Sequence, residues 1–132
     1  MIDETIYKKI REIAGTYEFE LVALFGSFAR GTTRSGSDID IAVLPKDPSV
    51  LSRASEEIGS AFGRNDVEIA DLSSPSPYLW HIVAKEGILL FESREGFFSE
   101  WKLRSMNLWF DTAPIRLRQK RYLQSWALSQ KH

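Results

Sequence analysis

Hydrophobic positions in the first part of the chain follow two different spacings. Four of them recur every three or four residues: Ile2, Ile6, Ile10 and Ile13. This spacing places them on one face of a helix, for which Gly15 is a suitable end. The apolar run from Phe19 to Phe25 instead predicts a strand, and it leads directly into the turn Gly26-Ser27.

Strands and helices continue to alternate through the middle of the chain. The segment 31–37 has the composition of a loop, and Asp38 to Leu44 predicts a second strand because apolar and polar residues alternate at its start. A helix is expected to begin at Asp47-Pro48-Ser49 and to run to about Phe62. After a turn that contains glycine, the alternating segment from Asp66 to Leu72 predicts a third strand.

The last part of the chain is expected to be mainly helical. A third helix should lie between Ser76-Pro77 and Gly87, and a short fourth strand should follow from Ile88 to Glu92. A long helical stretch is expected from about Glu95, interrupted or ended by Pro114, with a further helix after it. This alternation favours an α/β (α+β) fold, in which a small mixed β-sheet is flanked by helices.

Composition narrows the classes of protein that fit. The 132 residues suit one domain, and 43% hydrophobic residues are enough for a packed core. Because there is no cysteine, a disulfide framework, a zinc–thiolate site and a cysteine nucleophile are excluded. No apolar run approaches the roughly 20 residues of a membrane span, and the N-terminus lacks the pattern of a secretory signal. We therefore expect a cytoplasmic protein without a membrane partner.

Charge is distributed unevenly although the net charge is only −1. Residues 1–111 carry 12 basic and 18 acidic side chains, whereas residues 112–132 carry five basic and no acidic ones. We therefore divide the chain into a main domain, 1–111, and a basic C-terminal helical extension, 112–132, that is suited to contact a partner. The alternative is a solvated terminal segment.

Aromatic residues are frequent near this extension, with tryptophans at Trp80, Trp101, Trp109 and Trp126. Tryptophan and arginine are favoured at the centres of interfaces. Core packing explains the aromatic stretch from Phe97 to Phe110 equally well.

The clearest chemistry lies in three acidic side chains on two of the expected strands. Asp38 and Asp40 are two residues apart, so on a strand they point to one face with their Cα atoms roughly 6.6 Å apart, while Ile39 and Ile41 face the core. Two such carboxylates repel each other, and a hard divalent cation removes the repulsion. Glu68 joins them if its strand lies beside theirs. The set suits one or two Mg²⁺ ions, which can assist phosphoryl or nucleotidyl displacement.

The Gly26-Ser27 turn supplies groups that bind phosphate. Glycine lets the backbone approach a phosphate closely, and Ser27 offers a hydroxyl and an N–H at the start of a helical turn, where anions are favoured. Arg30 lies one turn further on and could reach a triphosphate. A lone Gly-Ser or a lone Asp-x-Asp would have little meaning, but here the turn ends one strand and the carboxylates begin the next.

These residues carry a resemblance to a known family. The block Gly26-Ser27-Phe28-Ala29-Arg30-Gly31, followed by Ser37-Asp38-Ile39-Asp40-Ile41, resembles the DNA polymerase β superfamily of nucleotidyltransferases. More closely, it is similar to the minimal MntA-type antitoxins, which pair with HEPN-domain ribonuclease toxins. The resemblance extends through Val67 to Leu72 and loosely to the end of the chain.

The resemblance implies a polymerase β-like nucleotidyltransferase fold and a Mg²⁺-dependent transfer of AMP from ATP. It assigns contact with the triphosphate to Ser27, and we expect Gly26, Arg30 and Ser37 to complete the nucleotide-binding set. It assigns catalysis and the metals to Asp38, Asp40 and Glu68, with Glu68 at a position where many relatives have Asp. In the antitoxin branch the acceptor is a tyrosine of the HEPN toxin, and its modification silences the nuclease.

Two other functions remain open at this point. The acceptor could instead be an RNA end or a small molecule such as an aminoglycoside, although aminoglycoside enzymes usually carry an extra helical domain and five basic charges are few for tight RNA binding. Alternatively, the chain could neutralise its partner by steric cover alone, against which the intact Ser27, Asp38 and Asp40 argue.

Four further residues have candidate roles. Asp71 lies three residues after Glu68, faces the other way on a strand, and is interpreted as a strand-end cap. His81 is interpreted as a packing or surface residue. Arg34 and Ser35 could contact phosphate or face solvent.

Overall fold

The elements follow the expected order along the chain. The computed structural model describes residues 2–31 and 38–130. Its elements are α1 (Glu4–Thr16), β1 (Phe19–Phe25), α2 (Gly26–Ala29), β2 (Ile39–Pro45), the 3₁₀ turn η1 (Pro48–Val50), α3 (Leu51–Phe62), β3 (Val67–Asp71), α4 (Pro77–Glu86), β4 (Ile88–Glu92), α5 (Phe97–Asp111) and α6 (Ala113–Ser129). Strands β1 and β4 occupy the residues expected from the sequence.

Helix ends differ from expectation in small ways that have physical causes. Helix α1 continues one residue past Gly15 to Thr16, because the backbone N–H of Tyr17 donates to the carbonyls of Ile13 and Gly15. The side chain of Asp3 caps the start of the same helix. Ser76 occupies the cap position of α4, but within the described residues its side chain makes no capping bond. Pro114 does not interrupt a helix: it lies in the first turn of α6, where a missing N–H costs nothing.

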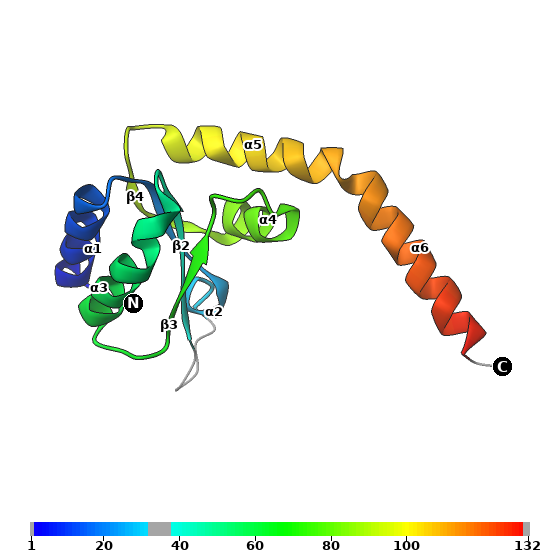
Figure 1. Ribbon diagram of the computed structural model, residues 1–132, viewed down its shortest axis with the longest axis horizontal. Helices are drawn as coiled ribbons and strands as arrows, with labels where there is room; N and C mark the ends of the chain where they lie inside the picture. Colours follow the sequence, from blue (N-terminus) through cyan, green and yellow to red (C-terminus); the bar gives the residue numbers. More distant parts are fainter. Residues whose placement is uncertain (1, 32–37, 131–132) are drawn as a thin grey trace.

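The four strands form one mixed sheet in the order β3-β2-β1-β4 (Figure 1). Strand β1 is antiparallel to both β2 and β4, whereas β2 and β3 are parallel. In this order β1 and β2 lie at the centre of the sheet, where most of their residues are buried. The strand that carries Glu68 is therefore the direct neighbour of the strand that carries Asp40.

Helices cover both faces of this sheet (Figure 1). On one face α1 and α3 pack on alternate residues of β2, namely Ile39, Ile41 and Val43. On the other face α4 and α5 pack on Ala42 and on two residues of β1. The second core contains Leu21, Ala23, Ala42, Leu72, Trp80, Val83, Phe97, Phe98 and Trp101. Because side chains alternate along a strand, Asp40 lies on the α4 and α5 side of the sheet.

Helix α6 extends away from this body (Figure 1). Across Ala113–Ser129, all of which the structure describes, no residue is buried. In the described part of the chain, no helix combines the length and the apolar character needed to cross a bilayer.

The buried sheet core and the exposed helix α6 predict different losses of stability for the same truncation. Ile41→Ala removes a fully buried side chain beneath α1 and α3, so we expect it to lower the free energy of unfolding by about 2–5 kcal/mol. Ile115→Ala makes the same change on α6, where the side chain is 53% exposed, and should cost less than about 1 kcal/mol. Urea denaturation of both variants measures the difference. Equal costs would contradict this division between core and extension.

Candidate functional site

The sheet register brings the three predicted carboxylates together. Asp40 on β2 is the direct neighbour of Glu68 on β3, and Asp38 precedes Asp40 by two residues on the same face. Asp40 is half-buried, whereas Asp38 and Glu68 are exposed. The condition set by the sequence, that the Glu68 strand lies beside the Asp38 strand, is met. The chemical roles of these residues remain predictions.

Mutual repulsion and burial both raise pKa values in this cluster. The negative charges of Asp38 and then Asp40 raise the pKa of Glu68 above its ordinary value. Burial, followed by the charge of Asp38, raises the pKa of Asp40. A hydrogen bond between Glu68 and Asp40 further raises the pKa of Glu68 and lowers that of Asp40. Like charges are therefore held close together, which costs stability unless a proton or a cation intervenes.

Gly26 is placed so that only glycine fits. Its φ of +76° lies in the left-handed region, where a side chain is strained. A Cβ atom at this position would also overlap Oδ2 of Asp40 and would lie 3.3 Å from its Cγ. The sequence indicated that Gly26 lets a phosphate approach the backbone. The structure adds that Gly26 leaves room for the Asp40 carboxylate, for which the sequence carried no signal.

The other nucleotide-binding candidates lie on or near the same turn. Ser27 is half-buried in the first turn of α2. Arg30 follows this turn, and its Nη1 donates a hydrogen bond of 2.8 Å to Oε2 of Glu86 on α4. Its positive charge also lowers the pKa of Asp40, which places the guanidinium within the field of the carboxylates. Ser37 lies outside the described residues.

Glu86 is a site residue that the sequence analysis missed. It is 56 residues from Arg30 along the chain and belongs to no recognisable motif. Its ion pair with Arg30 ties α4 to the turn between β1 and β2. Because both side chains are partly exposed, the pair positions Arg30 more than it stabilises the fold.

The three carboxylates of Asp38, Asp40 and Glu68 suit Mg²⁺ when waters and phosphate oxygens complete its coordination. Among residues 2–31 and 38–130, no three His, Asp or Glu side chains form a ready-made metal site. Mg²⁺ usually takes one or two carboxylates and completes its coordination with waters and phosphate oxygens. Asp38, Asp40 and Glu68 are hard oxygen donors that repel one another, which agrees with this mode of binding.

The roles of the secondary candidates are partly resolved. Asp71 accepts a hydrogen bond of 2.8 Å from the backbone N–H of Ser73, which confirms its interpretation as a strand-end cap. The His81 ring stacks on Trp109 with centroids 3.9 Å apart, which confirms packing as its role. Arg34 and Ser35 lie outside the described residues.

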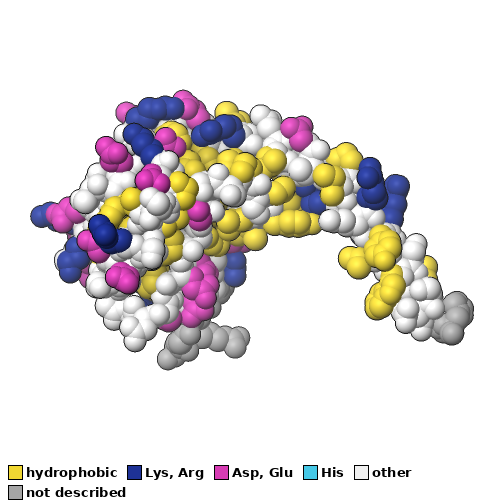
Figure 2. Space-filling view, in the orientation of Figure 1, with side chains coloured by type: hydrophobic (Ala, Val, Ile, Leu, Met, Phe, Trp, Pro, Cys, Tyr) yellow, Lys and Arg dark blue, Asp and Glu magenta, His cyan; other side chains and the backbone are white. Residues whose placement is uncertain are grey.

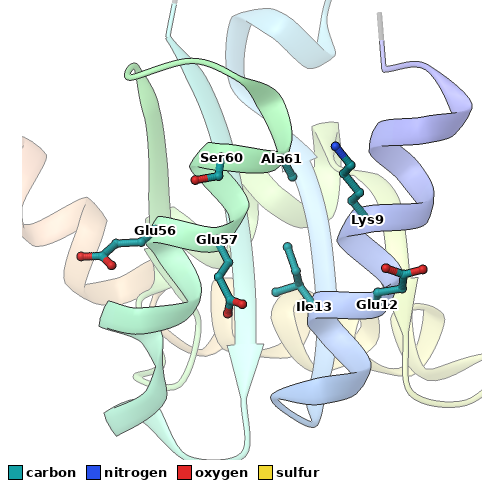
Figure 3. A pocket seen from close by; sticks show the side chains of 7 residues that line it. All are labelled: Lys9, Glu12, Ile13, Glu56, Glu57, Ser60 and Ala61. Atoms are coloured by element: carbon teal, nitrogen blue, oxygen red, sulfur yellow. The ribbon is translucent and has the colours of Figure 1, made fainter.

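A hollow of about 450 Å³ lies between α1 and α3 (Figure 3). Ile13 and Ala61 line it together with Ser60 and side chains of both charges, Lys9, Glu12, Glu56 and Glu57. None of the residues that line it belongs to the Gly-Ser turn or to the carboxylate cluster. We therefore interpret it as a groove between two helices that is separate from the candidate site.

Comparison with known proteins agrees with this geometry. A family model described as Polymerase beta, Nucleotidyltransferase matches residues 8–96. A protein adenylyltransferase named MntA, from Shewanella oneidensis, is 36% identical over 81 residues. The aligned part covers 59% of this chain and 58% of that protein, so the match spans somewhat more than half of the relative's length.

Solved structures share the fold. A toxin-antitoxin crystal structure with AMP-PNP superposes with a TM-score of 0.76 at 25% identity, covering 89% of this chain and 98% of that chain. A mutant MntA-HpeT toxin-antitoxin structure gives the same TM-score and identity, with coverages of 94% and 99%. A complex of tri-AMPylated Shewanella oneidensis HEPN toxin with MNT antitoxin, at 22% identity and a TM-score of 0.71 over 90% and 96%, shows the fold alone. The predicted fold class and the resemblance are confirmed.

The position of Gly26 generates a prediction with a matched control. Gly26→Ala should lose stability through backbone strain, about 1–2 kcal/mol, and should also displace the Asp40 carboxylate. Gly31→Ala carries a similar strain, since its φ is +71°, but its Cβ would meet none of the described residues within 4 Å. Both variants should lose thermal stability, and only Gly26→Ala should lose Mg²⁺-dependent nucleotide binding as measured by calorimetry. Equal loss of nucleotide binding in both would contradict the steric argument.

The carboxylate cluster predicts a characteristic dependence on pH. The pKa of Glu68 is raised in the folded protein, so the folded state binds more protons than the unfolded state just above the ordinary value of 4.5. Stability from this group is therefore present at low pH and is lost as pH rises through the raised pKa. Glu68→Gln should raise the Tm of the metal-free protein at pH 7.5 and leave it unchanged near pH 4.

Mg²⁺ provides the complementary measurement. It should raise the Tm of the wild type more than that of Glu68→Gln, because the cation relieves a repulsion that the variant lacks. Glu56→Gln, which removes an exposed glutamate of α3 outside the cluster, serves as the control. A Tm increase of Glu68→Gln that persists unchanged at pH 4 would rule out repulsion as its cause.

Proposed function

The chain belongs to the polymerase beta nucleotidyltransferase family, and from this premise we propose that it is an antitoxin that transfers AMP from ATP onto a tyrosine of a HEPN-domain ribonuclease toxin and so inactivates it. The observation that carries the proposal is the register of β2 and β3. It sets Asp40 beside Glu68, with Gly26 packed against Asp40.

Each residue has a defined task in this reaction. The backbone at Gly26 and the hydroxyl of Ser27 bind phosphate oxygens at the first turn of α2, and Arg30 adds positive charge. Asp38 and Asp40 would hold Mg²⁺, which when bound neutralises charge on the triphosphate. The tyrosine oxygen forms a bond to the α-phosphorus while the bond to pyrophosphate breaks. Glu68 accepts the phenol proton, and its raised pKa makes it a suitable base.

Three observations support a protein as the acceptor. The Shewanella oneidensis relative is named a protein adenylyltransferase. The structure at 25% identity is a toxin-antitoxin with AMP-PNP, an analogue of ATP. The carboxylate cluster is exposed at Asp38 and Glu68, so a second protein can approach it directly. We assign the reaction to the cytoplasm, where ATP, Mg²⁺ and ribonuclease targets occur together.

A labelling experiment tests the proposal. Purified chain, Mg²⁺ and α-labelled ATP are mixed with the product of the neighbouring gene, which we expect to be a HEPN-domain toxin. Label should appear on a tyrosine of that protein, and its ribonuclease activity should fall. Asp38→Asn/Asp40→Asn should slow transfer by about 100-fold or more, because the triphosphate charge is no longer neutralised.

Asp71→Asn is the matched control. It also removes a carboxylate from the β3 region, but Asp71 caps a strand end and should leave the rate of transfer nearly unchanged. Neutralisation of the toxin by the double variant as effectively as by the wild type would show that transfer is not the mechanism.

A further inference from the structure

Helix α6 carries apolar side chains that its own chain does not cover. Ile115, Tyr122 and Trp126 are each more than half exposed, and their spacing of seven and four residues places them on one face. Leu123, also exposed, lies beside this face. We call these four residues the α6 stripe. A helix of 17 residues with tertiary contacts only at its start is marginal in water, so an uncovered stripe of this size indicates a surface that a partner covers.

The start of α6 is nevertheless held firmly. Arg116 donates hydrogen bonds of 2.6 Å to the Trp109 carbonyl and 2.7 Å to the Thr112 hydroxyl. Its guanidinium also lies 3.4 Å from the centroid of the Trp109 ring. Trp109 in turn stacks on His81 of α4. These contacts fix the direction of α6 relative to α4 and α5, so the extended arm is preorganised and loses less entropy when a partner binds.

A groove of about 660 Å³ begins at the same tryptophan. It runs between α4 and α5 and is lined by Lys85, Lys102, Met106, Trp109 and Phe110 among others. Figure 2 shows hydrophobic side chains along α5 and, further out, on α6. The groove and the α6 stripe lie on consecutive helices, and Trp109, which lines the groove, contacts Arg116 at the start of α6.

The groove also contains an unsatisfied polar atom. Ser105 is 1% exposed and lines the groove, and within the described part of the chain its Oγ has no hydrogen-bond partner. A buried hydroxyl without a partner costs about 1–3 kcal/mol. Because this Oγ is itself buried, the cost belongs to the packing beneath the groove.

The charges around this surface define the occupant. Lys85 and Lys102 line the groove, and Arg118, Lys120 and Arg121 lie along α6, whose 17 residues include no acidic side chain. The α6 of a second copy would bring more positive charge to the groove and be repelled. The apolar residues argue against RNA, which offers mainly phosphate to such a surface. An apolar protein segment with acidic flanks matches both features.

We propose that the α6 stripe and the α4–α5 groove together form the docking surface for the protein acceptor, and that they receive an apolar segment of that acceptor flanked by acidic side chains. This proposal rests on the proposed antitoxin function and adds where and by what chemistry the toxin is held. Lys85 of the groove is followed by Glu86, which binds Arg30 beside the carboxylates, so the groove and the site of transfer share helix α4.

Variants on opposite faces of one helix test the α6 stripe. Tyr122→Ala/Trp126→Ala should raise the Kd for the HEPN-domain protein at least tenfold in calorimetry, because the variant removes two aromatic side chains from the interface. Leu117→Ala/Leu128→Ala removes two equally exposed side chains from the opposite face of α6 and should change the Kd less than twofold. Far-UV circular dichroism checks that both variants keep their helices.

A charge pair at one groove position tests the chemistry of the occupant. Met106 is 46% exposed, so either charge is tolerated by the fold. Met106→Glu should weaken binding more than Met106→Lys, because an acidic segment is repelled only by the former. Equal Kd values for the two opposite-face variants of α6, or weaker binding by Met106→Lys than by Met106→Glu, would overturn the proposal.

Two further outcomes would also overturn it. The stripe variant could lose binding to a single-stranded RNA of about 20 nucleotides while it keeps the protein partner, or it could convert a dimer of this chain to a monomer in sedimentation. If the wild type transfers no AMP to the toxin, the proposed function itself fails, which is a different outcome from failure of the docking surface. If the wild type transfers AMP and the stripe variant transfers equally well at low toxin concentration, only the docking surface is refuted.

Discussion

The crowding of like charges at the edge between β2 and β3 is the constraint on which the site depends. Asp40 and Glu68 are direct neighbours, and their repulsion would drive the strands to another register if nothing opposed it. Ile39 and Ile41 oppose it, because they are buried on the reverse face of β2. A slip of one residue would expose both isoleucines and bury both aspartates. The hydrophobic core thus keeps the carboxylates close together, where a proton or a cation would relieve their repulsion.

The two faces of the sheet serve different purposes. The face under α1 and α3 is a continuous apolar core, whereas the face under α4 and α5 is apolar over its middle and polar at the end next to α2. Asp40 and Ala42 lie on that second face within two residues of each other, one in the site and one in the core. The ion pair between Arg30 and Glu86 links α2 to α4, so the same helix supports the core, the site and the groove beside α5.

The sequence by itself determined the elements and the candidate chemistry. Strands β1 and β4 were predicted at the residues they occupy, because each is a short apolar run with clear turn signals at its end. Asp38 and Asp40 were assigned to one face because strand periodicity alone requires it. The helix around Pro114 was less well predicted, since proline tells where an N–H is missing but not whether a helix ends or begins there.

Tertiary structure decided every relation between residues far apart in the chain. Only strand order placed Glu68 beside Asp40, and only the approach of α2 to β2 made Gly26 a neighbour of the Asp40 carboxylate. The pairing of Glu86 with Arg30 and the stacking of His81 on Trp109 are further contacts between residues that are distant in the sequence. Local patterns record which face a side chain occupies. The partners on that face depend on how helices pack on the sheet, because such contacts join segments that no sequence period connects.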